Sequence, residues 1–374
     1  MQKERNPNRV VINLSALVHN LNMVKKLVGP STRIMGVVKS DGYGHGLLPV
    51  ARTLEGAGVD CLAVAYIDEA MRLIKCGVEL PIVILCGLLP EDVLSTVETG
   101  LVPVIFDLDM AERLDLEGRR QNRMVDVFLK VDTGMGRLGI SCDRIGAFLE
   151  AVVPFKNIRI QGILSHLSSA DDPVWAYTEK QLVRFRNILY AARSVGLNFH
   201  SNSLANSAGI MVDQALHFDM VRPGIMLYGG LPSPDFNAPV SLMPVMSFYG
   251  RVLQVRNVPA GVPISYGGTY VTERNSRIAI LSAGYGDGLP RSMSGHGHVL
   301  IRGRRAPLIG RICMNTCVCD ITDMGEVQAG DKVVFMGSFG KESITADDIA
   351  RWAKTISYEI FCSIGQKNNR EYTE

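Results

Sequence analysis

A single lysine ends an apolar run in the stretch IMGVVKSDGYGHG, residues 34–46, and is followed by glycines, a tyrosine and a histidine. A lysine at the end of a strand is usually a solvated side chain, and glycines after a strand usually mark a turn. In a closed site, however, the pKa of a lysine falls and its amine can form a Schiff base. Lys39 is therefore a candidate for covalent chemistry if other polar groups lie beside it.

Polar or glycine-rich groups stand at the ends of other apolar runs. They are KVDTGMGRLG at residues 130–139, His166 in ILSHLSSAD, Asn206 and Ser207 in LANSAG, and Arg222 and Gly224 in MVRPGI. A hydroxyl and backbone N–H groups at the start of a helix are typical ligands of a phosphate. A Schiff-base lysine beside a phosphate site indicates pyridoxal phosphate, although a phosphosugar aldolase would need the same two features.

The elements that must position these groups alternate between short apolar strands and longer helical stretches. The expected strands are residues 33–39, 61–66, 81–86, 102–107, 125–132, 158–166, 199–203 and 219–227. The helix-like segments between them include residues 46–58, 68–76, 109–117, 145–154 and 178–195. Eight such units predict a (β/α)8 TIM-type barrel, in which the active site lies at the carboxyl ends of the strands. A doubly wound open sheet is the alternative, but no GxGxxG follows the first strand.

The pattern of predicted secondary structure changes after residue 241. Short strands separated by glycine and proline turns follow, and helical periodicity returns only at residues 345–354. This pattern predicts a mainly antiparallel β domain, and LPSPDFNAP at residues 231–239 has the composition of a linker. The chain is therefore expected to form an α/β barrel domain over residues 1–240, with a strand and helix leading into it, and a β domain over residues 241–374.

Composition excludes several classes of function. The 374 residues are 47% hydrophobic and 20% charged, and the net charge is only +2. This balance gives no reason to expect a nucleic acid, a membrane surface or a polyanion as partner. No apolar run is long enough to span a bilayer, and the first seven residues are polar, so we expect a cytoplasmic protein without an export signal.

The eight cysteines are expected to be structural. Cys61, Cys76 and Cys86 lie in or beside apolar stretches and are predicted to be small buried hydrophobes. The three cysteines of RICMNTCVCDI, residues 311–321, have one parity and would share one face of a strand. Histidines precede them in SGHGHV, but no CxxC pair occurs, so no metal site is expected.

The motifs together resemble those of one family. VVKSDGYGHG resembles the pyridoxal-phosphate signature of bacterial alanine racemases. KVDTGMGRLG, MVRPGIMLYG, ISYGGTY, SAGYGDGLPR, GRICMN and ISYEI are similar to further motifs of that family, in the same order. The resemblance covers nearly the whole chain. It implies a homodimeric enzyme that uses pyridoxal 5'-phosphate to interconvert L- and D-alanine, either for peptidoglycan synthesis or for alanine catabolism.

The resemblance implies two catalytic bases. Lys39 matches the lysine that holds the cofactor covalently and acts on the D-isomer, and Tyr266 matches the opposite base, which acts on the L-isomer in the other subunit's site. A racemase needs such a pair because each face of the reacting carbon requires its own acid or base. In the family, His166 and Arg222 link the tyrosine to the pyridine nitrogen. An arginine keeps its proton, so it leaves that nitrogen unprotonated and limits transamination.

Further contacts are implied by the same resemblance. The residues that match phosphate ligands are Tyr43, Ser207, Gly224, Ile225 and Tyr358, with Asn206 in the same ANS motif. Arg137 and the backbone of Met314 match groups that bind the cofactor's phenolate oxygen and the substrate carboxylate. Lys130 matches a lysine that is often carbamylated in the family, and its carbamate would position Arg137. Tyr285, with Tyr358, matches an aromatic constriction at the entrance.

One departure from the family's pattern concerns the substrate. Asn315 stands where the family commonly has an aspartate beside the substrate carboxylate, and some broad-specificity racemases have a similar MNT sequence. A broad-specificity or serine-accepting racemase is thus the first alternative; such relatives are typically exported, which favours alanine here. A decarboxylase would place a carboxylate rather than Arg222 at the ring nitrogen. A non-catalytic pyridoxal-phosphate-binding protein would lack the domain that carries Tyr266.

Overall fold

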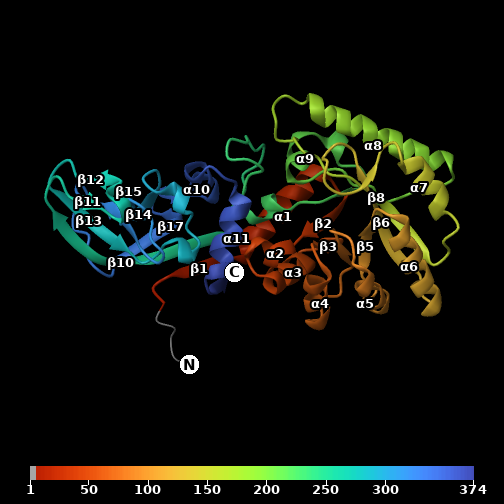
Figure 1. The fold of residues 1–374 in the computed structure, drawn as a ribbon, viewed down its shortest axis with the longest axis horizontal. Coiled ribbons are helices and arrows are strands. Elements are labelled where there is room, and N and C mark those ends of the chain that lie inside the picture. Colours follow the sequence, from red (N-terminus) through yellow and green to blue (C-terminus); the bar gives the residue numbers. More distant parts are fainter. Residues whose placement is uncertain (1–5) are drawn as a thin grey trace.

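Residues 6–374 are described by the computed structural model, in which a barrel lobe and a β lobe lie side by side (Figure 1). The barrel strands pair in parallel in the order β9, β2, β3, β4, β5, β6 and β8. Their bounds are β2 (Arg33–Val37), β3 (Cys61–Val64), β4 (Ile82–Ile84), β5 (Val102–Ile105), β6 (Val125–Asp132), β8 (Ile158–Leu164) and β9 (Met220–Val221). A short strand, β7 (Ile140–Ser141), pairs with the end of β6.

The barrel is closed by the segment between β8 and β9. Ser203 forms a parallel bridge with Leu164, and its N–H donates to the Ile163 carbonyl at 2.9 Å. On the other side, the Arg222 N–H donates to the Ala205 carbonyl at 3.0 Å. In the described range this segment takes the place of the seventh strand, and β9 then pairs with β2. The predicted (β/α)8 barrel is confirmed.

Five of the predicted strands end two residues earlier than expected, and two others are much shorter. The seventh, residues 199–203, is only a bridge. The eighth was expected to run to residue 227, but β9 ends at Val221 and a 3-10 helix occupies Ile225–Tyr228. Pro223 has no N–H to donate and Gly224 has an unusual backbone conformation, so the ladder stops where the chain bends over the barrel mouth.

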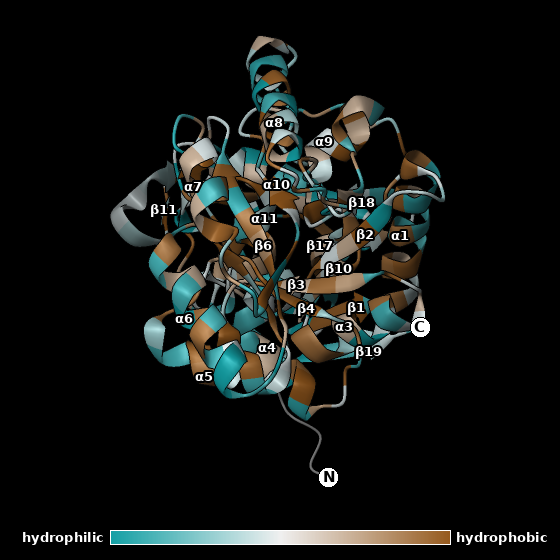
Figure 2. Ribbon diagram, turned by 90° about the vertical axis from the view of Figure 1, so that its right-hand side faces the viewer, coloured by the Kyte–Doolittle hydropathy of each residue, from teal (hydrophilic) through white to brown (hydrophobic). Residues whose placement is uncertain are grey.

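Helices surround the barrel and present polar outer faces, while the strands at the centre are apolar (Figure 2). They are α3 (Leu47–Gly56), α4 (Ile67–Lys75), α5 (Val93–Thr99), α6 (Leu108–Arg120), α7 (Ile145–Val152), α8 (Ala176–Ser194) and α9 (Ser207–Val212). Asp107 shows how the chain starts such a helix, since its carboxylate accepts the Met110 N–H at 2.8 Å. Helix α5 was not among the expected helices.

The β lobe is mainly antiparallel, as predicted. Its strands are β10 (Met246–Val258), β13 (Ser276–Leu281), β14 (His298–Ile301), β15 (Arg304–Ile309), β16 (Cys317–Asp320), β17 (Lys332–Phe339) and β18 (Glu342–Ile344), with a separate pair β11 (Pro263–Ile264) and β12 (Tyr270–Val271). The predicted helix at residues 345–354 is α10 (Ala346–Ala353), which begins at a capping box between Thr345 and Asp348. A further helix, α11 (Ser357–Lys367), lies between the lobes (Figure 1).

Both ends of the chain join the β lobe. Strand β1 (Arg9–Asn13) pairs antiparallel with β10 and parallel with the last strand, β19 (Arg370–Thr373). Helix α1 (Leu14–Val28) then leads to the barrel. The division into residues 1–240 and 241–374 stays a prediction, to which the structure adds that β1 pairs within the sheet of the second range.

Only some of the cysteines are buried as predicted. Cys61, Cys317 and Cys319 are buried, but Cys76 and Cys86 are exposed because each follows the end of a helix or strand. Cys313 precedes β16 instead of sharing its face, and its Sγ lies 3.4 Å from the Ser265 hydroxyl. Within residues 6–374, no group of three His, Cys, Asp or Glu side chains is placed to hold a metal ion. No helix in this range is long and apolar enough to cross a membrane.

Candidate active site

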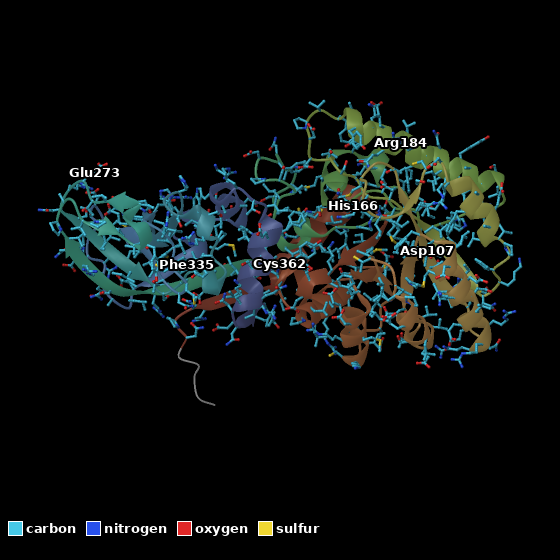
Figure 3. All side chains as sticks on the ribbon, viewed as in Figure 1. Asp107, His166, Arg184, Glu273, Phe335 and Cys362 are labelled. Atoms are coloured by element: carbon cyan, nitrogen blue, oxygen red, sulfur yellow. The ribbon has the colours of Figure 1, made fainter. Side chains whose placement is uncertain are left out.

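A cavity of about 550 Å³ lies at the carboxyl ends of the barrel strands. Most of the residues singled out from the sequence line it: Lys39, Tyr43, Lys130, Arg137, His166, Asn206, Ser207, Arg222, Gly224, Ile225 and Tyr358. Figure 3 shows His166 inside the barrel lobe, and Cys362 on α11 where the two lobes meet. The parallel strands thus bring together groups that are far apart in the sequence.

Lys39 begins a turn of left-handed helix, labelled α2 (Lys39–Tyr43) in Figure 1. The φ angles are +55° at Ser40, +55° at Asp41, +62° at Gly42 and +53° at Tyr43. Each non-glycine residue in this conformation costs about 1–2 kcal/mol, so such a turn persists only where its surroundings hold it. The turn places Lys39 and Tyr43 on the same cavity wall. The glycines of the motif predicted a turn but not its hand.

Several basic side chains line the cavity. Burial is the main cause that lowers the pKa of Lys39; the nearby Cys86 opposes this shift and the charge of Arg137 adds to it. Burial, together with the charge of Arg222, holds the pKa of Lys130 well below its ordinary value, and His166 is likewise held uncharged. A neutral Lys39 amine is the form that reacts with an aldehyde. The remaining cations favour an anionic ligand.

One end of the cavity offers hydrogen-bond donors to a phosphate. The Ser207 hydroxyl accepts the Gly224 N–H at 3.0 Å, and the rings of Tyr43 and Tyr358 lie 5.9 Å apart. Burial raises the pKa of both phenols, so they stay protonated and can donate. Asn206 caps α9, since its side chain accepts the Gly209 N–H at 3.0 Å. A Cβ at Gly224 would overlap the Tyr43 hydroxyl, so this glycine keeps the cradle open.

Arg222 is held rigidly in the barrel. Its guanidinium donates to the Ser203 hydroxyl and to the carbonyls of Ser165 and Leu204, and one nitrogen lies 3.5 Å from His166 Nδ1. Burial lowers the pKa of Arg222 to about 10, so the side chain remains charged at neutral pH. The pair predicted from the resemblance, His166 and Arg222, is thus in contact.

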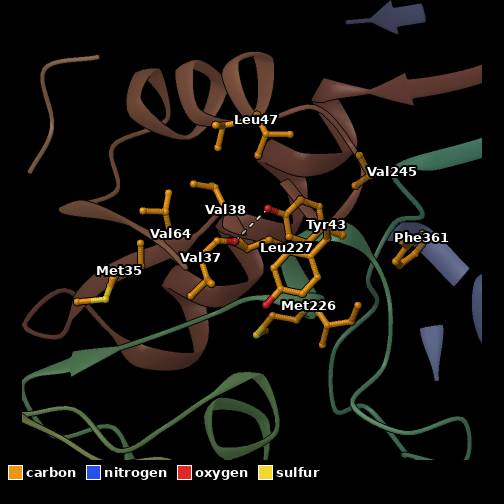
Figure 4. Packing of buried hydrophobic residues seen from close by; sticks show 14 of the residues in the cluster. Met35, Val37, Val38, Tyr43, Leu47, Val64, Met226, Leu227, Val245 and Phe361 are labelled. Atoms are coloured by element: carbon orange, nitrogen blue, oxygen red, sulfur yellow. Dashed lines mark hydrogen bonds between the residues drawn. The ribbon is translucent and has the colours of Figure 1, made fainter. Parts of the chain in front are cut away.

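Two supporting residues were not assigned a role from the sequence. Tyr228 is buried, donates to the Val37 carbonyl at 3.0 Å and stacks on Tyr43 with ring centroids 4.7 Å apart. Figure 4 shows Val37 and Tyr43 packed in this part of the core. Asp132 accepts the N–H groups of Gly134, Met135 and Gly136, which shapes the loop that leads to Arg137. Both residues lie in the motifs MVRPGIMLYG and KVDTGMGRLG, but the local pattern of these motifs does not indicate the contacts.

Four predicted residues lie outside the cavity because the β lobe carries them. Tyr266 is 69% exposed and Met314 is 58% exposed, and Tyr285 and Asn315 are exposed as well. Tyr266 starts a 3-10 helix between β11 and β12, at the end of the β lobe far from the barrel (Figure 1). The Asn315 amide donates to the Asp287 carboxylate at 3.3 Å. A single chain therefore does not bring Tyr266 to Lys39.

Comparison with known proteins agrees with the geometry of the cavity. Models of the alanine racemase N-terminal and C-terminal domains match residues 12–232 and 245–372. An alanine racemase from Syntrophobacter fumaroxidans is 44% identical over 363 residues, which cover 97% of this chain and 96% of the relative. The chain belongs to the alanine racemase family.

Solved structures of alanine racemases have the same fold. The crystal structure from Streptomyces lavendulae has a TM-score of 0.92 and 33% identity, and covers 100% of this chain and 98% of that one. The structure from Bartonella henselae, which has covalently bound pyridoxal phosphate, has a TM-score of 0.89 and 31% identity, with coverages of 98% and 99%. Membership of the alanine racemase family makes the protein an isomerase that racemises alanine with pyridoxal phosphate.

Replacing Gly224 by alanine tests the phosphate cradle. The added methyl group would overlap the hydroxyl of Tyr43, which is buried and cannot move away freely. We expect about tenfold weaker binding of pyridoxal phosphate and a stability loss of about 1–3 kcal/mol. Titration of the apoprotein with the cofactor and thermal unfolding measure the two effects. Gly146→Ala is the control, because nothing lies within 4 Å of its Cβ position; equal affinities in the two variants would contradict the assignment.

Proposed function

We propose that the protein racemises alanine with two bases, Lys39 of one chain and Tyr266 of a second chain. The observation that carries the proposal is the cavity itself, where a lysine of lowered pKa lies beside phosphate donors and a charged arginine. When bound, pyridoxal phosphate withdraws electrons from the substrate's Cα, so that a side-chain base can remove its proton. Lys39 and Tyr266 would serve opposite faces of that carbon.

The other cavity residues would bind and orient. The hydroxyls of Tyr43, Ser207 and Tyr358, with the backbone of Gly224 and Ile225, would hold the phosphate. Arg222 would face the ring nitrogen and donate a hydrogen bond to it. His166 would link Arg222 to Tyr266 by hydrogen bonds. Since Ser203, Ser165 and Leu204 already fix the guanidinium, it needs little reorganisation to fill this role.

The position of Tyr266 supports a homodimer. A base must approach within hydrogen-bond distance of the proton it transfers, but Tyr266 is 69% exposed on the β lobe of its own chain. In a two-fold dimer each chain can deliver the same surface to the other's cavity. Met314 and Tyr285, which are also exposed, would then contribute the substrate-carboxylate contact and the entrance constriction of the partner's site.

Lys130 and Arg137 would form the remaining wall. Both line the cavity, and the pKa of Lys130 is far below its ordinary value because of burial and neighbouring cations. A neutral amine is the form that reacts with carbon dioxide, so carbamylation would place a negative charge among the arginines and position Arg137 for the substrate carboxylate. Arg137 is exposed in the single chain.

Incubation of the purified holoenzyme with L-alanine tests the proposal. Circular dichroism should show the loss of optical activity, and a D-amino-acid-specific assay should show that D-alanine accounts for it. Production of carbon dioxide and an amine instead would identify a decarboxylase. No turnover by a holoenzyme that retains its cofactor absorbance would favour a binding protein.

A serine-accepting racemase is the second candidate, because of the neutral amide at Asn315. In the structure this amide donates to Asp287, which also accepts the Gly284 N–H at 3.0 Å. Both residues lie on the same loop system as Met314, which is proposed to contact the substrate carboxylate. We therefore expect alanine to be preferred and serine to be turned over measurably.

Asn315→Asp is expected to shift the alanine-to-serine ratio of kcat/KM several-fold toward alanine, on the order of 1 kcal/mol. The new carboxylate would face Asp287 and add negative charge near the substrate carboxylate. Both constants should be measured for both substrates. If Asn315 only braces the Met314 loop, both substrates lose rate together, and an unchanged ratio rules out a role in specificity.

A cytoplasmic location and a supply of D-alanine for peptidoglycan, or alternatively alanine catabolism, are also proposed. All eight cysteines lie within residues 6–374 and are free thiols, which suits a reducing compartment. Cell fractionation tests the location. Dependence of growth on added D-alanine after deletion of the gene would identify the biosynthetic role.

A further inference from the structure

The left-handed turn after Lys39 is held by the last strand of the chain. Arg370 of β19 donates to the Asp41 carboxylate and, at 3.0 Å, to the Gly44 carbonyl. Asp41 lies in the middle of the turn and Gly44 directly follows its last residue. The side chains of Arg370 and Asp41 are 23% and 22% exposed, so the ion pair is partly shielded from water. A single guanidinium thus ties the middle of the turn to its end.

A second residue of β19 contacts the same region. Tyr372 stands two positions after Arg370 and therefore on the same face of the strand. Its hydroxyl lies where a Cβ on Gly46 would be, and Gly46 precedes the first residue of α3. Glu371 alternates to the other face and pairs with Arg9 in an exposed ion pair. One face of β19 thus packs on the turn and the other faces solvent.

The remaining sides of the turn are also closed. A Cβ at Gly44 would overlap the Phe361 carbonyl of α11, and the Asp41 N–H donates to Glu69 of α4 at 3.2 Å. The Asp41 carboxylate also accepts the Leu47 N–H at 2.9 Å. Because the turn has unfavourable backbone angles at several residues, its population depends on these contacts. Of the charged side chains in these contacts, Arg370 is the one that comes from the β lobe.

We propose that Arg370 is a positioning residue of the racemase, which holds Lys39 and Tyr43 on the cavity wall by clamping the turn through Asp41 and Gly44. The inference rests on the proposed roles of Lys39 and Tyr43. It means that the β lobe, besides offering Tyr266 to a second chain, tightens the cofactor site of its own chain. Loss of the clamp should therefore weaken cofactor binding before it affects the overall fold.

Arg370→Met tests the clamp, because methionine keeps an unbranched apolar stem and removes the donors. We expect about tenfold weaker binding of pyridoxal phosphate to the apoprotein, followed by its absorbance near roughly 420 nm. Hydrogen exchange at the amides of Gly44 and Gly46, which close the turn onto Ser40 and Asp41, should accelerate about tenfold. Glu371→Gln is the matched control on the opposite face of β19 and should leave both quantities unchanged.

Further variants separate a positioning role from a merely structural one. Arg370→Lys should recover part of the affinity, since lysine can pair with Asp41 but cannot hold both acceptors in a fixed geometry. Asp41→Asn should weaken cofactor binding less in Arg370→Met than in the wild type; part of its effect remains because the Asp41 carboxylate also accepts the Leu47 N–H and lies 3.8 Å from Arg72. The unfolding midpoint of the apoprotein should match that of Glu371→Gln.

Unchanged cofactor affinity and unchanged exchange in folded Arg370→Met would overturn the proposal. If Arg370→Met does not fold, Arg370→Lys decides, and wild-type affinity and exchange in that variant would overturn it as well. An equal loss of affinity in Glu371→Gln would also overturn it, because the effect would then belong to the strand as a whole. The proposed function fails separately, if Lys39→Ala still binds the cofactor covalently.

Discussion

Lys39→Ala is expected to remove the absorbance of the covalently bound cofactor near roughly 420 nm and to lower racemisation on the order of 10³-fold or more. The reason is that Lys39 is proposed both to bind the cofactor and to act as a base, and an alanine can do neither. Its pKa is lowered mainly by burial, which makes the neutral, reactive amine available. Absorbance spectra of the purified protein and the rate on L-alanine measure the two effects.

Lys130 provides the control for this experiment, because it is the other lysine among the residues that line the described cavity. Lys130→Met should keep the absorbance of the bound cofactor, since Lys39 remains. Retained absorbance in Lys39→Ala, together with its loss in Lys130→Met, would transfer the covalent role to Lys130.

Mixing two inactive variants is expected to restore activity. If Tyr266 serves the cavity of a second chain, neither Lys39→Ala nor Tyr266→Phe alone should be active. In the mixed dimer, one site combines an intact Lys39 with an intact Tyr266 from the other chain, and the second site lacks both. About half of the sites in mixed dimers should therefore be active. The measurement is the racemisation rate of heterodimers purified through two different tags.

The two variants should be carried through the same exchange procedure separately as controls. If both bases came from one chain, every site in the mixed dimer would lack one base, and verified subunit exchange would restore nothing. That result would refute the shared site and leave the exposed position of Tyr266 without a function.

The order of apolar runs was sufficient to predict the barrel and most of the cavity. Parallel strands in a closed barrel end at one mouth, so polar groups after Val37, after Asp132 and near Val221 meet there whatever their separation in the chain. The local pattern therefore predicted Lys39, His166 and Arg222 as neighbours. The pattern of apolar residues did not predict the length of very short elements, because such elements contain too few residues to show a strand periodicity. Residues 199–203, for example, form only a bridge.

The hand of the turn after Lys39 could not be inferred from residue types. Glycine permits positive φ and aspartate tolerates it, but Ser40 and Tyr43 do not favour it. They adopt it because Arg370, Glu69 and α11 hold the turn. The burial of Tyr228 against Tyr43 is likewise a matter of packing. These features arise from contacts between distant segments, which no window of sequence contains.

Tyr266 also shows the difference between what the sequence predicts and what only the tertiary structure determines. Its motif identified it as a base by resemblance, yet only the folded chain shows that it is exposed and lies away from the cavity that it is proposed to serve. The chemical roles of the side chains could thus be predicted from residue types, because reactivity is a local property of a side chain. Placement was not, because it depends on long-range pairing: Arg370 and Asp41 are 329 residues apart in the chain and in contact in the fold.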